Sequence, residues 1–78
     1  MPRYFFHLYD DVVSLDEEGR DMPDLESARA AGVREARQMM VGTVAEGRLD
    51  LSHRIDIADE SGAVLATVAF RDAVTVTG

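Results

Sequence analysis

Two stretches of the chain favour extended backbone, and they flank one stretch with the periodicity of a helix. Residues 3–22 and 54–70 are expected to hold two pairs of strands, and residues 24–46 an amphipathic helix. These elements occupy nearly the whole chain of 78 residues, so a single domain over residues 1–78 is expected. Little of the chain is left for a separate catalytic apparatus.

The first predicted strand, residues 3–9, carries aromatic side chains on both of its faces. Alternation places Tyr4, Phe6 and Leu8 on one face and Phe5, His7 and Tyr9 on the other. Short acids at residues 10–11 favour a turn, after which residues 12–15 are expected to return as a second strand. Residues 16–19 form an exposed acidic bend in which Gly19 can adopt a positive φ.

The helix is predicted from its ends as well as from its periodicity. Asp24 is expected to be the N-cap, and Gly47 to follow the last helical turn. Helical spacing gathers one mostly small stripe, consisting of Leu25, Ala28, Gly32, Ala36, Met39 and Thr43, with Met40 at its edge. Small residues allow the helix to lie close to one aromatic face of the first strand.

The second pair of strands is predicted at residues 54–58 and 63–70, joined by a turn at residues 59–62 in which Gly62 has a positive φ. Residues 71–78 are either a flexible tail or an extra strand. The fold class is therefore α+β, with the order ββαββ and one helix on one face of a four-stranded sheet. Counting strands along the chain, a β-grasp-like sheet order 2-1-4-3 is preferred, with the last strand parallel to the first, and 2-1-3-4 is the alternative.

The net charge of −7 bears on partners and location. Most acids of the first half lie between Asp10 and Glu26, against the single base Arg20, and this field repels phosphate backbones and anionic lipids. Nucleic-acid binding is therefore not expected. No apolar run reaches the length of a membrane span, and the N-terminus lacks a leader pattern, so a cytoplasmic location without membrane contact is expected.

Self-association is the expected way of supplementing a small core. The chain has no cysteine, which removes disulfides and thiolate metal sites together. One helix covers only one sheet face, whereas the first strand offers aromatic side chains to both. A homodimer is predicted, joined through the uncovered face or by edge pairing, with Phe5 and Tyr9 as its anchors.

Candidate chemistry is sparse. His7, followed by Asp10 and Asp11, is a weak candidate for a ligand or metal site, but a metal needs at least three convergent ligands and His53 is remote in sequence. No tightly bound metal and no cofactor are expected. The sequence also lacks a nucleophile motif and a phosphate-binding loop, so it does not indicate an enzyme.

Several segments occur here in an order that is similar to one family. They are residues 2–7 (PRYFFH), 16–19 (DEEG), 23–28 (PDLESA), 59–65 (DESGAVL) and 70–74 (FRDAV). Together they resemble the DUF6894-type family of small alphaproteobacterial, rhizobial proteins of unknown function. The resemblance implies a bacterial source and provides no catalytic or binding residues.

The favoured function is a small non-enzymatic interaction or regulatory module that acts as a homodimer. One alternative is a nucleic-acid-linked, antitoxin-like regulator that uses Arg29, Arg34 and Arg37 of the helix. The other is a small-ligand binder, which an enclosed pocket beside His7 would favour.

Overall fold

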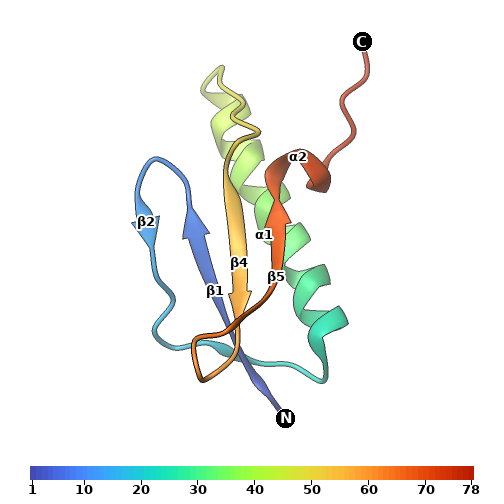
Figure 1. Cartoon of the computed structure of the whole chain (residues 1–78). Coiled ribbons are helices and arrows are strands. Elements are labelled where there is room, and N and C mark those ends of the chain that lie inside the picture. The colour runs from blue at the N-terminus through green and yellow to red at the C-terminus, as the bar shows by residue number, and fades with distance from the viewer.

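A computed structural model of residues 1–78 shows an antiparallel sheet with one long helix lying across one of its faces (Figure 1). The elements in chain order are β1 (Arg3–Tyr9), β2 (Val13–Ser14), β3 (Arg20–Asp21), α1 (Leu25–Ala45), β4 (Arg54–Ala58), β5 (Val64–Ala69) and α2 (Phe70–Ala73). The α+β class, with a single long helix on one face, is confirmed.

The strands are arranged in the order β2-β1-β4-β5, and β3 pairs with the beginning of β1. Every pairing is antiparallel. This is the alternative order from the sequence; the preferred order, with the last strand parallel to the first, is wrong. The burial pattern gives the reason, because β4 is buried from Ile55 to Ala58 on both faces, whereas only Val68 of β5 is buried. A strand buried on both faces belongs in the middle of the sheet, and the more exposed strand belongs at its edge.

α1 begins and ends where its sequence predicts. Asp24 Oδ1 accepts a hydrogen bond of 2.8 Å from the backbone N–H of Ser27, which confirms the N-cap. Beyond the last turn, Gly47 has a φ of +84°. The stripe is confirmed at its small positions Ala28, Gly32 and Ala36, all of which are buried.

One prediction within α1 is wrong, since the two methionines exchange their places. Met40 is buried in the core, and Met39 is only partly buried and packs against it. The face of α1 that packs on the sheet therefore includes Met40 at its centre, and Met39 lies at the edge of that face.

The helix covers the face of β1 that carries Tyr4 and Phe6. These two side chains belong to the core cluster, and Leu8 packs against it. In the neighbouring strand β4, Ile55 and Ile57 contribute the largest fully buried side chains. The face with Phe5, His7 and Tyr9 is left uncovered by α1.

The chain after β5 is neither a simple tail nor an extra strand. The strand predicted to residue 70 ends at Ala69, and Phe70 begins the short helix α2 while remaining buried. Its N–H donates to the carbonyl of His53 at 2.9 Å, and Arg37 Nε donates to the carbonyl of Ala73 at 2.6 Å. These two bonds hold α2 against β4 and α1.

Candidate functional site

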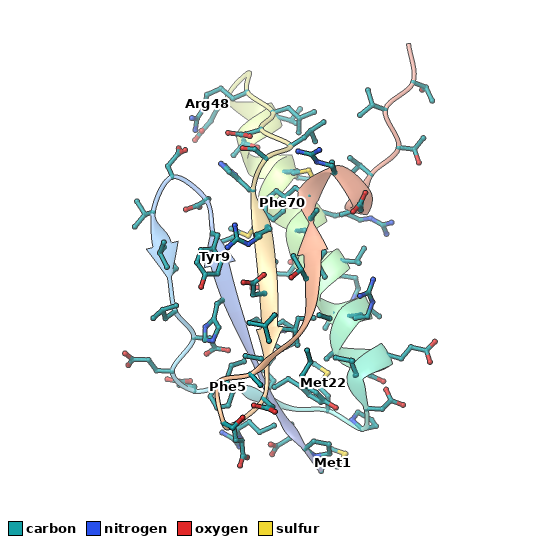
Figure 2. All side chains as sticks on the ribbon, viewed as in Figure 1. Met1, Phe5, Tyr9, Met22, Arg48 and Phe70 are labelled. Atoms are coloured by element: carbon teal, nitrogen blue, oxygen red, sulfur yellow. The ribbon has the colours of Figure 1, made fainter.

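The open face of the sheet carries the two residues predicted as interface anchors. Phe5 and Tyr9 project from β1 on the side away from α1 (Figure 2). Both are partly buried by their own chain. A Cβ added at Gly19 would lie 3.0 Å from the Phe5 ring, and the Arg54 guanidinium lies 4.2 Å from the centre of the Tyr9 ring. Each aromatic side chain thus already has an intramolecular neighbour.

His7 lies on the same open face and has a structural role. Its Nδ1 accepts a hydrogen bond of 3.0 Å from the backbone N–H of Asp16. This contact has a structural role, since it links β1 to the bend that follows β2. Across the sheet, His7 is opposite Asp56, and Asp56 is opposite Thr67.

Asp16 binds backbone N–H groups at the outer edge of β1. Its Oδ2 accepts from the N–H of Phe6 at 3.1 Å, and its Oδ1 accepts from the N–H groups of Glu18 and Gly19 at 3.1 and 3.0 Å. Partial burial opposes ionisation of this carboxyl, but the three backbone N–H donors outweigh it and hold the pKa of Asp16 below its ordinary value. With β2 and β3 on either side, little of this edge is free.

The other edge of the sheet is unpaired. β5 hydrogen-bonds to β4 on one side and has no strand on the other. Its sequence, VLATVA, contains neither a charged residue nor a proline, and Val64 and Leu65 are 55% and 44% exposed. Unpaired backbone along an uncharged strand is a template for pairing with another strand.

A buried acid stands in the middle of the open face. Asp56 is only 8% exposed, although it lies on the side away from the helix. Thr67 Oγ1 donates to its Oδ1 at 2.9 Å, and Arg54 Nε lies 3.4 Å from the same oxygen. These two partners satisfy Oδ1, and the Thr67 bond links β5 to β4 on this face.

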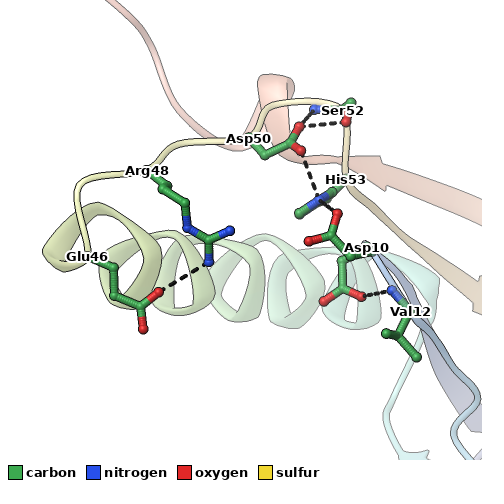
Figure 3. A network of polar contacts seen from close by, with 8 residues as sticks. Asp10, Val12, Glu46, Arg48, Asp50, Ser52 and His53 are labelled. Carbon is green, nitrogen blue, oxygen red and sulfur yellow. Dashed lines mark hydrogen bonds and ion pairs between the residues drawn. The ribbon is translucent and has the colours of Figure 1, made fainter.

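A polar pocket lies at the end of the sheet where the β1–β2 turn meets the α1–β4 connection. Its volume is about 250 Å³. Its charged lining consists of Asp10, Asp11, Arg48, Asp50 and His53, and its apolar lining includes Met39 and Phe70. Figure 3 shows that the carboxylates reach this region from the two separate connections.

His53 is the central residue of this pocket. Its Nε2 lies 3.1 Å from Asp50 Oδ2 and 3.7 Å from Asp11 Oδ1. Nε2 is buried, yet neither contact has hydrogen-bond geometry. The ring packs edge-on against Phe70, with 5.6 Å between the ring centres.

Asp50 is oriented by the turn in which it lies. Its Oδ1 accepts from the N–H and the hydroxyl of Ser52 at 2.8 and 2.5 Å, which leaves Oδ2 facing His53. The hydroxyl bond, followed by the backbone bond, lowers the pKa of Asp50 from its ordinary value, and the nearby charges of His53 and Arg48 act in the same direction.

The structure thus divides the predicted site residues. Asp10 and Asp11 line the pocket, whereas His7 does not take part in it. Asp50 was not predicted from the sequence, and His53 was set aside there as remote from His7. The only local indication of the cluster was that Asp50 and His53 lie three residues apart in one connection. Asp11, the third residue of the cluster, is distant in sequence.

A second exposed surface is apolar and lies beside the end of α1. Val41, Val44 and Leu49 face the last residues of the chain, including Val76, across a groove of about 550 Å³. All four are about half exposed or more. No helix of the structure is long and apolar enough to cross a membrane.

A family model described as "Domain of unknown function (DUF6894)" matches residues 3–71. The chain belongs to this family. No curated protein and no solved structure matches the chain. The DUF6894 match runs from β1 into α2, so it includes both the pocket residues and the free edge of β5.

Proposed function

We propose that this DUF6894 protein is a small, non-enzymatic interaction module that acts as a homodimer, and that two copies pair through β5. The observation that supports this is the unprotected edge of β5, which has no charge, proline or covering strand between Val64 and Ala69. Natural proteins usually protect a strand edge of this kind.

A second copy is the partner that best fits this edge. Antiparallel pairing of two β5 strands is two-fold symmetric, so one surface serves both chains. The acidic turn before β5, with Asp59 and Glu60, would then lie toward the end of the partner strand, where Arg71 stands. Arg71, which is followed by Asp72, therefore provides one opposite charge to this turn at each end of the paired strands.

The open sheet face is the second possible arrangement for the same dimer. Phe5 and Tyr9 would be its anchors, as the sequence predicts. We favour β5 because Gly19 already lies against Phe5 and Arg54 against Tyr9. A stable interface buries about 1,000 Å² or more in total. Side chains beside the strand, such as exposed Leu65, would have to add to the backbone pairing.

The proposal also includes a cytoplasmic location and no catalytic role. Small secreted domains are commonly rich in disulfides, and this chain has no cysteine. The sequence contains no nucleophile motif, and His7 Nδ1 is engaged by the backbone of Asp16.

The test is light scattering coupled to size exclusion, at concentrations up to high micromolar. We expect the wild-type mass to be twice the chain mass of 8.6 kDa. Leu65→Lys and, separately, Val64→Lys should shift the mass to that of one chain, because edge lysines oppose strand pairing. Leu15→Lys is the matched control, since Leu15 is 62% exposed and lies outside β5.

Three results would contradict β5 pairing. The first is a wild-type monomer at every concentration. The second is a dimer that persists in both β5 variants but is lost in Tyr9→Ala, which would place the interface on the open face. The third is a dimer lost only in Val44→Lys, which would place it at the apolar groove beside α1. Circular dichroism of each variant establishes that it is folded.

A further inference from the structure

We propose that Asp11, Asp50 and His53 form a labile binding site for a divalent first-row transition ion of the Zn²⁺ or Mn²⁺ type. The ion would join the β1–β2 turn to the connection between α1 and β4. This inference does not depend on the homodimer. It is compatible with the expectation that no metal is tightly bound, since two of the three ligands are well exposed.

The donor atoms of the three residues lie close enough together for one ion to draw them in. One atom from each residue lies within 4.8 Å of the other two. The ligand atoms of a tetrahedral zinc ion, with bonds of about 2.0–2.1 Å, lie about 3.3 Å apart. The distances from His53 Nε2 to Asp50 and to Asp11, 3.1 and 3.7 Å, are on either side of that value.

The imidazole is the group that distinguishes this cluster from a group of surface acids. His53 Nε2 is buried and has no hydrogen-bond partner, although two carboxylate oxygens are close to it. Leaving such a nitrogen unsatisfied costs free energy, so the arrangement calls for a ligand there. The ring is held by its contact with Phe70, and the carbonyl of His53 is fixed by the Phe70 N–H. The nitrogen is therefore preorganised.

The carboxylates differ in how firmly they are placed. Ser52 fixes one oxygen of Asp50 and turns the other toward His53. Asp11 has a side chain that is 78% exposed, so it can close the remaining distance at little cost. Asp10 also lines the pocket and adds negative charge there, although its Oδ1 accepts from the N–H of Val12 at 2.8 Å.

Arg48 does not block the site. Its guanidinium lines the same pocket, but it pairs with Glu46 at 3.2 Å. The ligands available to an ion are thus one nitrogen and two carboxylate oxygens, with water in the remaining positions. Mg²⁺ and Ca²⁺ favour oxygen ligands alone, whereas an imidazole nitrogen suits Zn²⁺. Mn²⁺ favours oxygen ligands, which the two carboxylates provide, so it should bind here more weakly than Zn²⁺.

The competing explanation is a plain ion pair between a protonated His53 and its two aspartates. The chain contains a matched control for it. Asp59 and Ser61 repeat the turn of Asp50 and Ser52, with Asp59 Oδ1 accepting from the N–H and the hydroxyl of Ser61 at 2.9 and 2.6 Å. That turn has no histidine and belongs to no metal-ligand cluster.

Calorimetric titration of tag-free protein with Zn²⁺ and with Mn²⁺ tests the proposal. We expect one ion per chain, and binding that is at least tenfold weaker in Asp11→Asn, Asp50→Asn and His53→Gln. Removing a residue that only supports a metal ligand already weakens binding about tenfold or more, so removing a ligand should weaken it at least as much. Asp59→Asn should bind as the wild type does. Because Asp11 is exposed, Asp11→Asn tests the site without endangering the fold.

Proton NMR provides a second readout. The chain has two histidines, so Mn²⁺ added at a small fraction of the protein concentration should broaden the ring signals of His53 much more strongly than those of His7. No heat of binding, equal affinity in all three ligand variants, or equal broadening of both rings would each overturn the site in favour of the ion pair.

Discussion

At the residue scale, the packing of α1 against the sheet is tested most directly at Gly32. A Cβ at this position would lie 3.2 Å from Val68 Cγ2 and 3.5 Å from Ile57 Cδ1, inside the core. We expect Gly32→Ala to lower the free energy of unfolding by about 1–3 kcal/mol, because the added methyl group overpacks the contact. Urea denaturation measures this change.

Gly42 provides the control in the same helix. A Cβ there would have nothing within 4 Å, so Gly42→Ala should stabilise the protein by up to about 1 kcal/mol through helix propensity. A higher melting temperature for both variants would mean that the α1–sheet contact is looser than the structure describes.

Asp16 should make the stability depend on pH in the acid range. The pKa of this carboxyl is lowered from 3.8 in the folded chain, mainly by backbone N–H donors acting against partial burial. Its stabilisation is therefore present above pH 4 or so and is lost as the pH falls through the lower folded value. Asp16→Asn should cost about 1–2 kcal/mol at pH 7, from weaker hydrogen bonds.

Urea denaturation of both proteins across the acid range checks this prediction. The difference between wild type and Asp16→Asn should shrink below pH 4, where the wild-type carboxyl becomes neutral. An unchanging difference down to pH 2 would show that the charge of Asp16 contributes nothing to folding.

The residues of the pocket show why local sequence reasoning stops short of the site. Asp50 and His53 are neighbours in one connection, so their spacing was visible. Asp11 joins them only because the β1–β2 turn and the α1–β4 connection meet at the same end of the sheet. That meeting depends on β1 pairing with β4, which no residue near Asp11 encodes. The sheet order preferred from the sequence placed the last strand, not β4, beside β1, so it did not lead us to expect Asp11 near His53.

At the element scale, the elements that depend on nearby residues could be predicted, and the arrangement that depends on distant residues could not. α1 could be predicted because its cap, its small stripe and Gly47 all act within a few residues. The strand order could not, since pairing joins residues about 50 positions apart, such as Phe6 and Ile57. The sequence of β4 did indicate a central strand, because Ile55–Ala58 contains only one polar residue. That residue, Asp56, made one face of the strand look exposed, although it is buried.

The N-cap of α1 yields a prediction at this scale. The 21-residue helix has one side chain bonded to its first-turn N–H groups, that of Asp24. Asp24→Ala should destabilise the protein by about 1 kcal/mol, within a usual range of 0.5–2. Asp24→Ser should retain most of the stability, because serine caps a helix nearly as well. Equal melting temperatures for the wild type and Asp24→Ala would contradict the assigned role.

At the scale of the whole molecule, the shape explains why apolar side chains remain exposed. The protein measures 40 × 24 × 16 Å, so it is a thin, two-layered body with a helix on one side only. Its core cluster holds 11 buried residues, and further apolar side chains stay exposed on β5 and beside α1. A small body of this form gains core volume and loses exposed apolar surface when it pairs with a second copy.

The charge of the whole molecule leads to the last prediction, that nucleic acids bind weakly. The net charge is −7, and Arg37, one of the three helix arginines considered for such a role, donates to the carbonyl of Ala73. Arg29 and Arg34 are exposed, but two arginines neutralise too few phosphates to overcome that field. Anisotropy titration with labelled duplex DNA and RNA at physiological salt should give a Kd weaker than about 10⁻⁴ M. Micromolar binding that is lost in Arg34→Gln would contradict this prediction and identify the helix as a nucleic-acid surface. Arg71→Gln, which lies outside α1, is the control for the loss of one positive charge.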